Sequence, residues 1–178
     1  WLYVGRVGTG FSDALINDVS KRIQGGGKKP TAYVPTEDTD LRSATVQGLM
    51  ERFGVDTEHA QRVAATALNL FEQARGADSA RAALKLQWAA RLHEIGCRIS
   101  HSDYHRHGAY ILDNTDAAGF AVPELHRLGV LVLGQRGKVR KLDADLTDPV
   151  FALQLLCLRV AVALCHARRT PDTQGLTL

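Results

Sequence analysis

The most informative part of the sequence is Leu92-His93-Glu94-Ile95-Gly96, followed after four residues by His101-Ser102-Asp103-Tyr104-His105-Arg106-His107-Gly108-Ala109-Tyr110-Ile111-Leu112. It places four of the seven histidines of the chain, with two carboxylates, within fifteen residues. Histidine and carboxylate side chains hold metals, transfer protons and contact phosphate oxygens. Because polar groups inside a folded protein need partners, this stretch is a candidate site.

Apolar residues at helical spacing predict an all-α domain from residue 41 onward. The first stripe consists of Val46, Leu49, Met50 and Phe53 and ends at Gly54. The segment Val150–Leu164 is apolar on nearly all sides, which predicts a central helix covered by its neighbours. The helices are expected at residues 41–53, from 56 or 57 to 75, 79–95, 105–112, 123–133 and 149–164.

The first 40 residues differ from the rest of the chain. A short β-prone segment and a short amphipathic helix precede Gly25-Gly26-Gly27-Lys28-Lys29-Pro30, which is typical of a linker. The 178 residues fit one domain with an appendage. We therefore expect a β/α leader over residues 1–40, a helical domain over 41–169 and a flexible tail over 170–178.

Composition excludes several classes of protein. The formal net charge of +3 is too small to indicate a nucleic-acid partner. Cys97, Cys157 and Cys165 form neither a disulfide framework nor a metal-binding CxxC pair. No apolar run reaches membrane-spanning length and no signal peptide is recognised, so a cytoplasmic protein without a membrane partner is expected.

The HEIG step at 93–96 and the GAYIL helix start at 108–112 resemble the C-terminal helical domain of the exopolyphosphatase / guanosine pentaphosphate phosphohydrolase family. The resemblance covers roughly residues 41–169 and implies a helical bundle similar to the HD domain. In that family catalysis takes place in N-terminal actin-like domains that use Mg²⁺. The resemblance therefore implies no cofactor in this chain, a polyphosphate or other polyanion as ligand, and a homodimer or a catalytic domain as partner.

The same resemblance marks a degenerate metal site. HD domains bind a metal through a His, a later His-Asp pair and a final-helix Asp. Here His59 and the pair His93-Glu94 match the first positions, but the stretch 158–166 has no Asp. On this interpretation His59, His93 and Glu94 are the ligands, and the alternative function is an autonomous metal-dependent phosphohydrolase. Two other interpretations stay open: Glu94 accepts a hydrogen bond from His59 or His101 and joins two helices, or the histidines line an anion-binding groove.

Basic residues predict where such a groove would lie. Five of them fall between residues 127 and 141 without any carboxylate, so the local field exceeds that expected from the net charge. Polyphosphate carries about one charge per phosphate and would fit a basic track. The predicted polyphosphate-binding residues are His101, His105, Arg106, His107, Arg127, Arg136, Lys138, Arg140 and Lys141.

The leader has a resemblance of its own. Residues 3–13, with Lys29-Pro30 and Val34-Pro35, are similar to part of the OB-fold region of bacterial ATP-dependent DNA ligases. The fragment lacks the nucleotidyl-lysine motif and most of the barrel. A role as a DNA ligase accessory is therefore a third, separate hypothesis.

Overall fold

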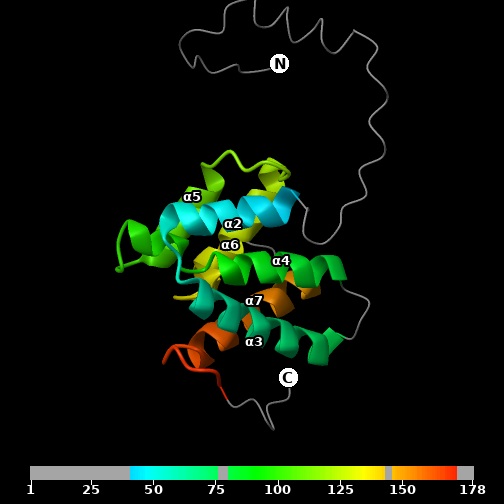
Figure 1. The fold of residues 1–178 in the computed structure, drawn as a ribbon. Helices are drawn as coiled ribbons and strands as arrows, with labels where there is room; N and C mark the ends of the chain where they lie inside the picture. The colour runs from blue at the N-terminus through cyan, green and yellow to red at the C-terminus, as the bar shows by residue number, and fades with distance from the viewer. Residues whose placement is uncertain (1–40, 76–79, 143–145, 172–178) are drawn as a thin grey trace, which may run out of the picture. The chain divides into compact units, whose positions relative to one another are not determined.

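The computed structural model describes residues 41–75, 80–142 and 146–171. Within these ranges the chain forms six α-helices, two short 3-10 helices and no strand, which confirms the predicted all-α fold (Figure 1). The predicted leader and most of the predicted tail lie outside the described residues. The elements are α2 (Leu41–Phe53), α3 (Thr57–Arg75), α4 (Ala80–Arg91), η3 (Ile95–Arg98), α5 (Tyr104–Asp113), α6 (Val122–Gly134), η4 (Val139–Lys141) and α7 (Pro149–Leu164).

Helix boundaries follow local chemistry. Gly54 has φ +63, a left-handed conformation that glycine adopts readily, and it ends α2 as predicted. The carboxylate of Asp148 accepts the backbone N–H groups of Val150 and Phe151, and Pro149 occupies the first turn of α7. Asp56 likewise accepts the N–H of His59 at 3.0 Å at the start of α3. The sequence thus fixes where both helices that flank the candidate site begin.

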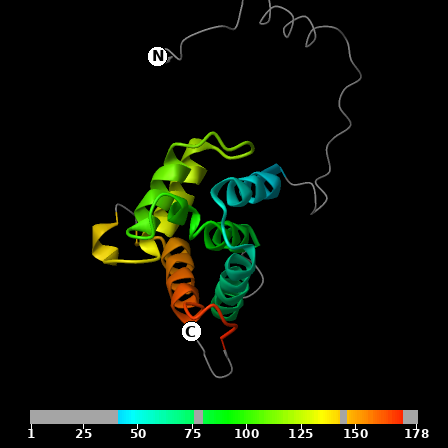
Figure 2. The same ribbon diagram turned by 60° about the vertical axis from the view of Figure 1, so that its left-hand side comes forward.

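The core lies between α3, α4 and α7, with the α5–α6 pair packed beside them (Figures 1 and 2). Trp88 is 2% exposed and makes an edge-to-face contact with Phe120, their ring centroids 5.0 Å apart. Each of the six α-helices contributes at least one of the largest fully buried apolar side chains, namely Met50, Leu70, Phe71, Leu86, Trp88, Leu112, Leu131 and Leu158. This layer positions the N-terminus of α3 against the turn that follows α4.

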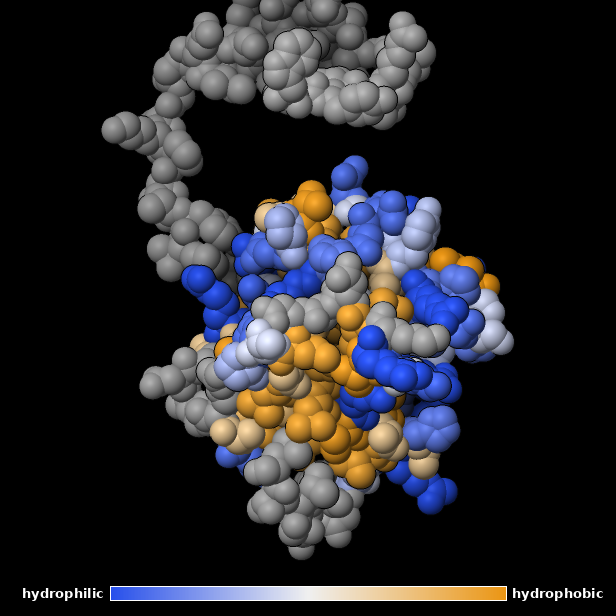
Figure 3. Space-filling view, turned by 180° about the vertical axis from the view of Figure 1, so that it is seen from behind, coloured by the Kyte–Doolittle hydropathy of each residue, from blue (hydrophilic) through white to orange (hydrophobic). Residues whose placement is uncertain are grey.

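Helix α7 is not covered on all sides, contrary to the prediction from its composition. Leu158 is fully buried, but Leu156 is 46% exposed and Leu153 and Val160 are only partly buried. An apolar surface accordingly remains open on the back of the molecule (Figure 3). The substitution Leu156→Asp would disrupt a helix covered on all sides, but at this exposed position the carboxylate is expected to face solvent.

The predicted third helix also ends earlier than expected. α4 stops at Arg91, and Leu92-His93-Glu94 form a turn that leads into η3. The reason is a close backbone crossing: a Cβ at Gly96 would lie 2.0 Å from the carbonyl oxygen of Tyr104 and 2.5 Å from the amide nitrogen of Gly108. The two glycines of the motif therefore allow η3 to pack directly on α5. No helix among the described residues has the length and apolar character needed to cross a membrane.

Candidate functional site

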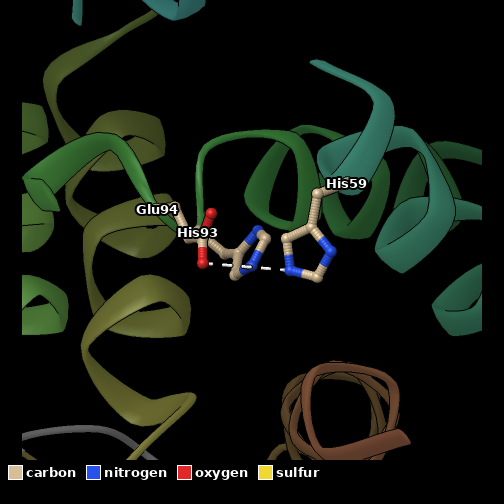
Figure 4. A group of neighbouring side chains, drawn as sticks. All are labelled: His59, His93 and Glu94. Atoms are coloured by element: carbon tan, nitrogen blue, oxygen red, sulfur yellow. Dashed lines mark ion pairs between the residues drawn. The ribbon is translucent and has the colours of Figure 1, made fainter. Parts of the chain in front are cut away.

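His59, His93 and Glu94 meet at the junction of α3 and the turn after α4 (Figure 4). His59 lies in the first turn of α3, and the other two residues come directly after α4. One potential ligand atom from each side chain lies within 4.8 Å of the others. The structure thus brings together the three residues that the sequence nominated.

His93 is held by its surroundings but has a free ring nitrogen. The side chain is buried, and its Nδ1 lies 2.7 Å from the carbonyl oxygen of Ala90. A carbonyl can only accept, so Nδ1 carries the proton and Nε2 is left with its lone pair. No partner for Nε2 is found among the described residues. Burial lowers the pKa of His93 to about 4, so the ring is neutral near pH 7.

His59 is buried beside it. The centroids of the two imidazole rings are 5.4 Å apart and the rings are tilted by 53°. Its Nε2 is 3.8 Å from Oε1 of Glu94, a distance too long for a hydrogen bond. Burial lowers the pKa of His59, although the nearby Glu94 opposes this shift. Both rings therefore present neutral nitrogens toward the same carboxylate.

Arg168 completes the cluster and was missed by the sequence interpretation. Its guanidinium donates to Asp56 at 2.6 Å and to both oxygens of Glu94 at 3.3 Å. The available signal was the basic group His166, Arg168 and Arg169 directly after the last apolar helix. The other proposed partner of Glu94, His101, lies exposed on the surface.

A cavity of about 790 Å³ opens next to the cluster. Its lining includes His59, His93 and Glu94 together with four further basic side chains, Arg136, Arg159, His166 and Arg168. Glu94 is the only carboxylate among the residues that line it. The opposite wall is apolar and comes from α7: Leu156, Val160, Val162 and Ala163.

Two of the arginines are held in place by the fold. Arg159 donates to the carbonyl oxygens of Gly134 and Gly137, at 2.5 Å and 3.1 Å. Arg136 stacks on Tyr104 with its guanidinium carbon 5.4 Å from the ring centroid. Tyr104 is itself half-buried, and burial raises its pKa, so it stays a neutral phenol near pH 7. Arg159 and the exposed Arg136 therefore each have a contact within the fold that orients the guanidinium group.

The predicted polyphosphate groove is only partly assembled here. Arg136 lines the cavity, whereas none of the seven other predicted residues with described side chains does so. Arg127 donates to Asp148 at 2.9 Å and stacks on Phe151 at 4.8 Å. Arg106 pairs with Asp103 at 3.7 Å, and burial lowers the pKa of His105. The remaining described side chains are exposed or half-buried, namely His101, His107, Lys138 and Arg140, while Lys141 ends η4.

The chemistry available at the site follows from these residues. Two neutral imidazole nitrogens and a carboxylate are a ligand set that divalent transition metals accept. The arginines beside them are suited to phosphate oxygens, which they bind through paired N–H groups. The site can therefore bind a cation at its base, an anion at its mouth, or both.

Comparison with known proteins identifies relatives of this domain. The family described as Ppx/GppA phosphatase, domain III, matches residues 41–177. A guanosine-5'-triphosphate,3'-diphosphate pyrophosphatase of Pseudoalteromonas translucida is 37% identical over 138 residues, which are 74% of this chain and 28% of that protein. The enzyme of the same name from Vibrio atlanticus is 33% identical over 183 aligned positions, covering 92% of this chain and 37% of the relative. The chain thus spans about a third of the length of these relatives.

Proposed function

Because this chain belongs to the Ppx/GppA phosphatase family through its domain III, we propose that it is the phosphate-binding C-terminal module of a phosphohydrolase. The relatives carry the name of an enzyme that acts on guanosine-5'-triphosphate,3'-diphosphate, a nucleotide rich in phosphate groups. On this proposal the catalytic groups belong to other domains. The chain described here supplies binding rather than hydrolysis.

The observation that carries the proposal is the charge of the cavity. Arg136, Arg159 and Arg168 converge on it, and its one carboxylate, Glu94, already accepts from Arg168. Phosphate chains are multiply charged acceptors, and arginine binds them with two parallel hydrogen bonds. Since Arg159 and Arg136 are positioned before any ligand arrives, less side-chain entropy is lost on binding.

A specific observation also favours the autonomous metal-dependent phosphohydrolase as a second candidate. The histidine and carboxylate atoms of the cluster lie within 4.8 Å of one another. A hydrolytic site must also activate a water on the metal, and the final-helix carboxylate that would help is absent from residues 158–166. We therefore expect no turnover of tripolyphosphate or guanosine pentaphosphate by the chain alone with Mg²⁺ or Mn²⁺. Metal-dependent turnover that disappears in His93→Ala would favour the second candidate.

Binding of tripolyphosphate, measured by isothermal titration calorimetry, tests the first proposal. Arg136→Gln should weaken binding roughly tenfold, because a charge-assisted hydrogen bond contributes on the order of 1.5 kcal/mol. Arg140→Gln is the matched control, an exposed arginine four residues away that does not line the cavity. Its effect should be less than about twofold at physiological salt, where distant surface charges are screened.

Two outcomes would contradict the proposal. Equal losses in the Arg136 and Arg140 variants would mean that a diffuse basic surface, as first predicted from residues 127–141, binds the anion. No measurable binding by the unmodified chain would remove the phosphate-binding role altogether.

A further inference from the structure

The cluster at the base of the cavity has an unexplained feature that anion binding does not use. His93 Nε2 is a buried nitrogen atom without a partner among the described residues, and the bond from Nδ1 to the Ala90 carbonyl leaves it with a lone pair. An unsatisfied polar atom inside a protein lowers stability, so it calls for an explanation. An anion cannot supply it, because a nitrogen with a lone pair accepts and does not donate.

We propose that His59, His93 and Glu94 bind one divalent transition-metal ion, with the open side of the ion facing the arginine-lined cavity. His93 is oriented for this role by the bond from Nδ1 to the Ala90 carbonyl, the outer-shell arrangement that fixes metal-binding histidines elsewhere. The turn that carries it is fixed as well, since Gln135 Nε2 donates to the His93 carbonyl at 2.6 Å.

The distances require the cluster to contract around the ion. An ion with bonds of about 2.0–2.2 Å holds tetrahedral ligand atoms about 3.3–3.6 Å apart. His59 Nε2 and Glu94 Oε1 are 3.8 Å apart and must close by roughly 0.2–0.5 Å, and no pair in the cluster, all within 4.8 Å, must close by more than roughly 1.5 Å. Rotation of the Glu94 side chain, which lines the cavity, and of the His59 ring, whose Nδ1 has no partner among the described residues, would provide this movement.

The ligand types select the class of ion. Imidazole nitrogen with one carboxylate oxygen suits zinc, manganese, iron, cobalt and nickel, whereas magnesium and calcium prefer sites made of oxygen alone. Three protein ligands leave a coordination position free for water or another oxygen ligand. The cavity gives such a ligand direct access.

Arg168 opposes the metal and so provides a distinguishing test. It shares Glu94 at 3.3 Å, and its positive charge repels a cation. It also holds Asp56 at the shorter distance of 2.6 Å, so it keeps a partner when Glu94 turns toward the ion. Removing the guanidinium should therefore raise the affinity for metal, an effect that a purely structural ion pair would not produce.

The experiment uses the full chain after chelator treatment and titrates it with Zn²⁺ alone in the calorimeter, with Co²⁺ absorption as a second readout. We expect one equivalent to bind, Glu94→Gln to weaken binding at least tenfold, and Arg168→Gln to tighten it by three- to tenfold. His126→Gln is the matched control, because His126 pairs with Asp113 at 3.0 Å on the exposed surface. It should leave the affinity unchanged.

A stoichiometry well below one, or an affinity unchanged in both Glu94→Gln and His59→Gln, would overturn the proposal. So would loss of binding in Cys97→Ser alone, since that thiol lies on η3 near Glu94, where burial, and after it the carboxylate, raises its pKa. Thermal unfolding of each variant shows whether it folds. If Glu94→Gln does not fold, the proposal is judged by whether Arg168→Gln binds Zn²⁺ more tightly than the unmodified chain. Because no phosphate is present, this test is independent of tripolyphosphate binding.

Discussion

Gln154 and His93 are both only 1% exposed, yet their environments differ in one respect. Gln154, on α7, uses both ends of its amide: Nε2 donates to the Ala82 carbonyl at 2.7 Å, and Oε1 accepts from Arg127 at 3.4 Å. His93 uses one nitrogen and leaves the other without a partner among the described residues. Both polar atoms of the Gln154 side chain have hydrogen-bond partners in the protein, whereas one ring nitrogen of His93 has none among the described residues.

The difference separates a structural junction from a candidate binding site. The junction of Gln154, Arg127 and Asp148 joins α7 to α6 and to the start of α4, and every member has a protein partner. Satisfied networks of this kind specify a unique arrangement of helices. The cluster around His93 leaves a buried lone pair without a partner among the described residues, a loss of stability that is expected where a site serves a ligand.

The largest effect is expected at the crossing that holds the cluster in place. Gly96→Ala puts a methyl group 2.0 Å from the Tyr104 carbonyl and 2.5 Å from the Gly108 nitrogen, and neither backbone atom can move independently. The free energy of unfolding should fall by about 3 kcal/mol or more. Urea denaturation followed by circular dichroism measures this loss.

Gly48→Ala is the control for that substitution. Gly48 lies within α2, and a Cβ there meets nothing within 4 Å. An alanine in a helix interior stabilises by about 0.5–1 kcal/mol relative to glycine. If the two variants unfolded at the same urea concentration, the close crossing of η3 and α5 would not be what fixes the turn.

Leucine substitutions at Gln154 and His93 test the difference between the two buried side chains directly. Gln154→Leu leaves the Ala82 carbonyl and Arg127 short of a partner inside the protein, which should cost about 2 kcal/mol. His93→Leu removes a side chain that was only half satisfied, so its loss should be smaller, about 1 kcal/mol or less. Urea denaturation followed by circular dichroism measures the loss of unfolding free energy in both variants. A larger loss for His93→Leu would mean that the histidine is mainly structural.

Local patterns predicted the helices well, because burial on one face determines their spacing. The stripe of Val46, Leu49 and Met50 is buried as expected, and Pro149 opens α7 as expected. The end of α4 could not be predicted in this way, since it depends on the contact of Gly96 with a helix that begins eight residues later. The exposure of Leu156 was missed for a related reason: hydropathy does not show whether a neighbour exists to cover a side chain.

For the site, the family resemblance grouped His59 with His93 and Glu94 across 34 positions, whereas local patterns alone failed for partners far along the chain. The geometry of His59, His93 and Glu94 agrees with their nomination as a group, while their role as metal ligands stays a prediction. Arg168 reaches Glu94 across 74 positions, and nothing local indicates that pairing. Arg127 was grouped with Arg136 because they are close in sequence, yet the fold places Arg127 in the structural junction.

The smallest expected effects concern the two aspartates that begin α3 and α7. Asp56 and Asp148 each accept a helix N-terminal N–H and each hold an arginine, Arg168 and Arg127 respectively. Replacing either by alanine should cost about 1 kcal/mol, the usual value for a lost N-cap. The hydrogen bond from Arg127 lowers the pKa of Asp148, and the backbone bond from His59 lowers that of Asp56.

A lowered carboxyl pKa gives the sign of the pH dependence. The unfolded chain takes up protons near the ordinary value of 3.8, whereas the folded chain resists protonation, so stability falls as the pH drops through this range. Each alanine variant should lose part of that slope in unfolding experiments between about pH 5 and pH 2. The two should differ in one respect: Asp56→Ala releases Arg168 to Glu94 and so weakens Zn²⁺ binding, whereas Asp148→Ala leaves it unchanged. Equal Zn²⁺ affinities in the two variants would show that the junction and the cluster do not differ in the way proposed.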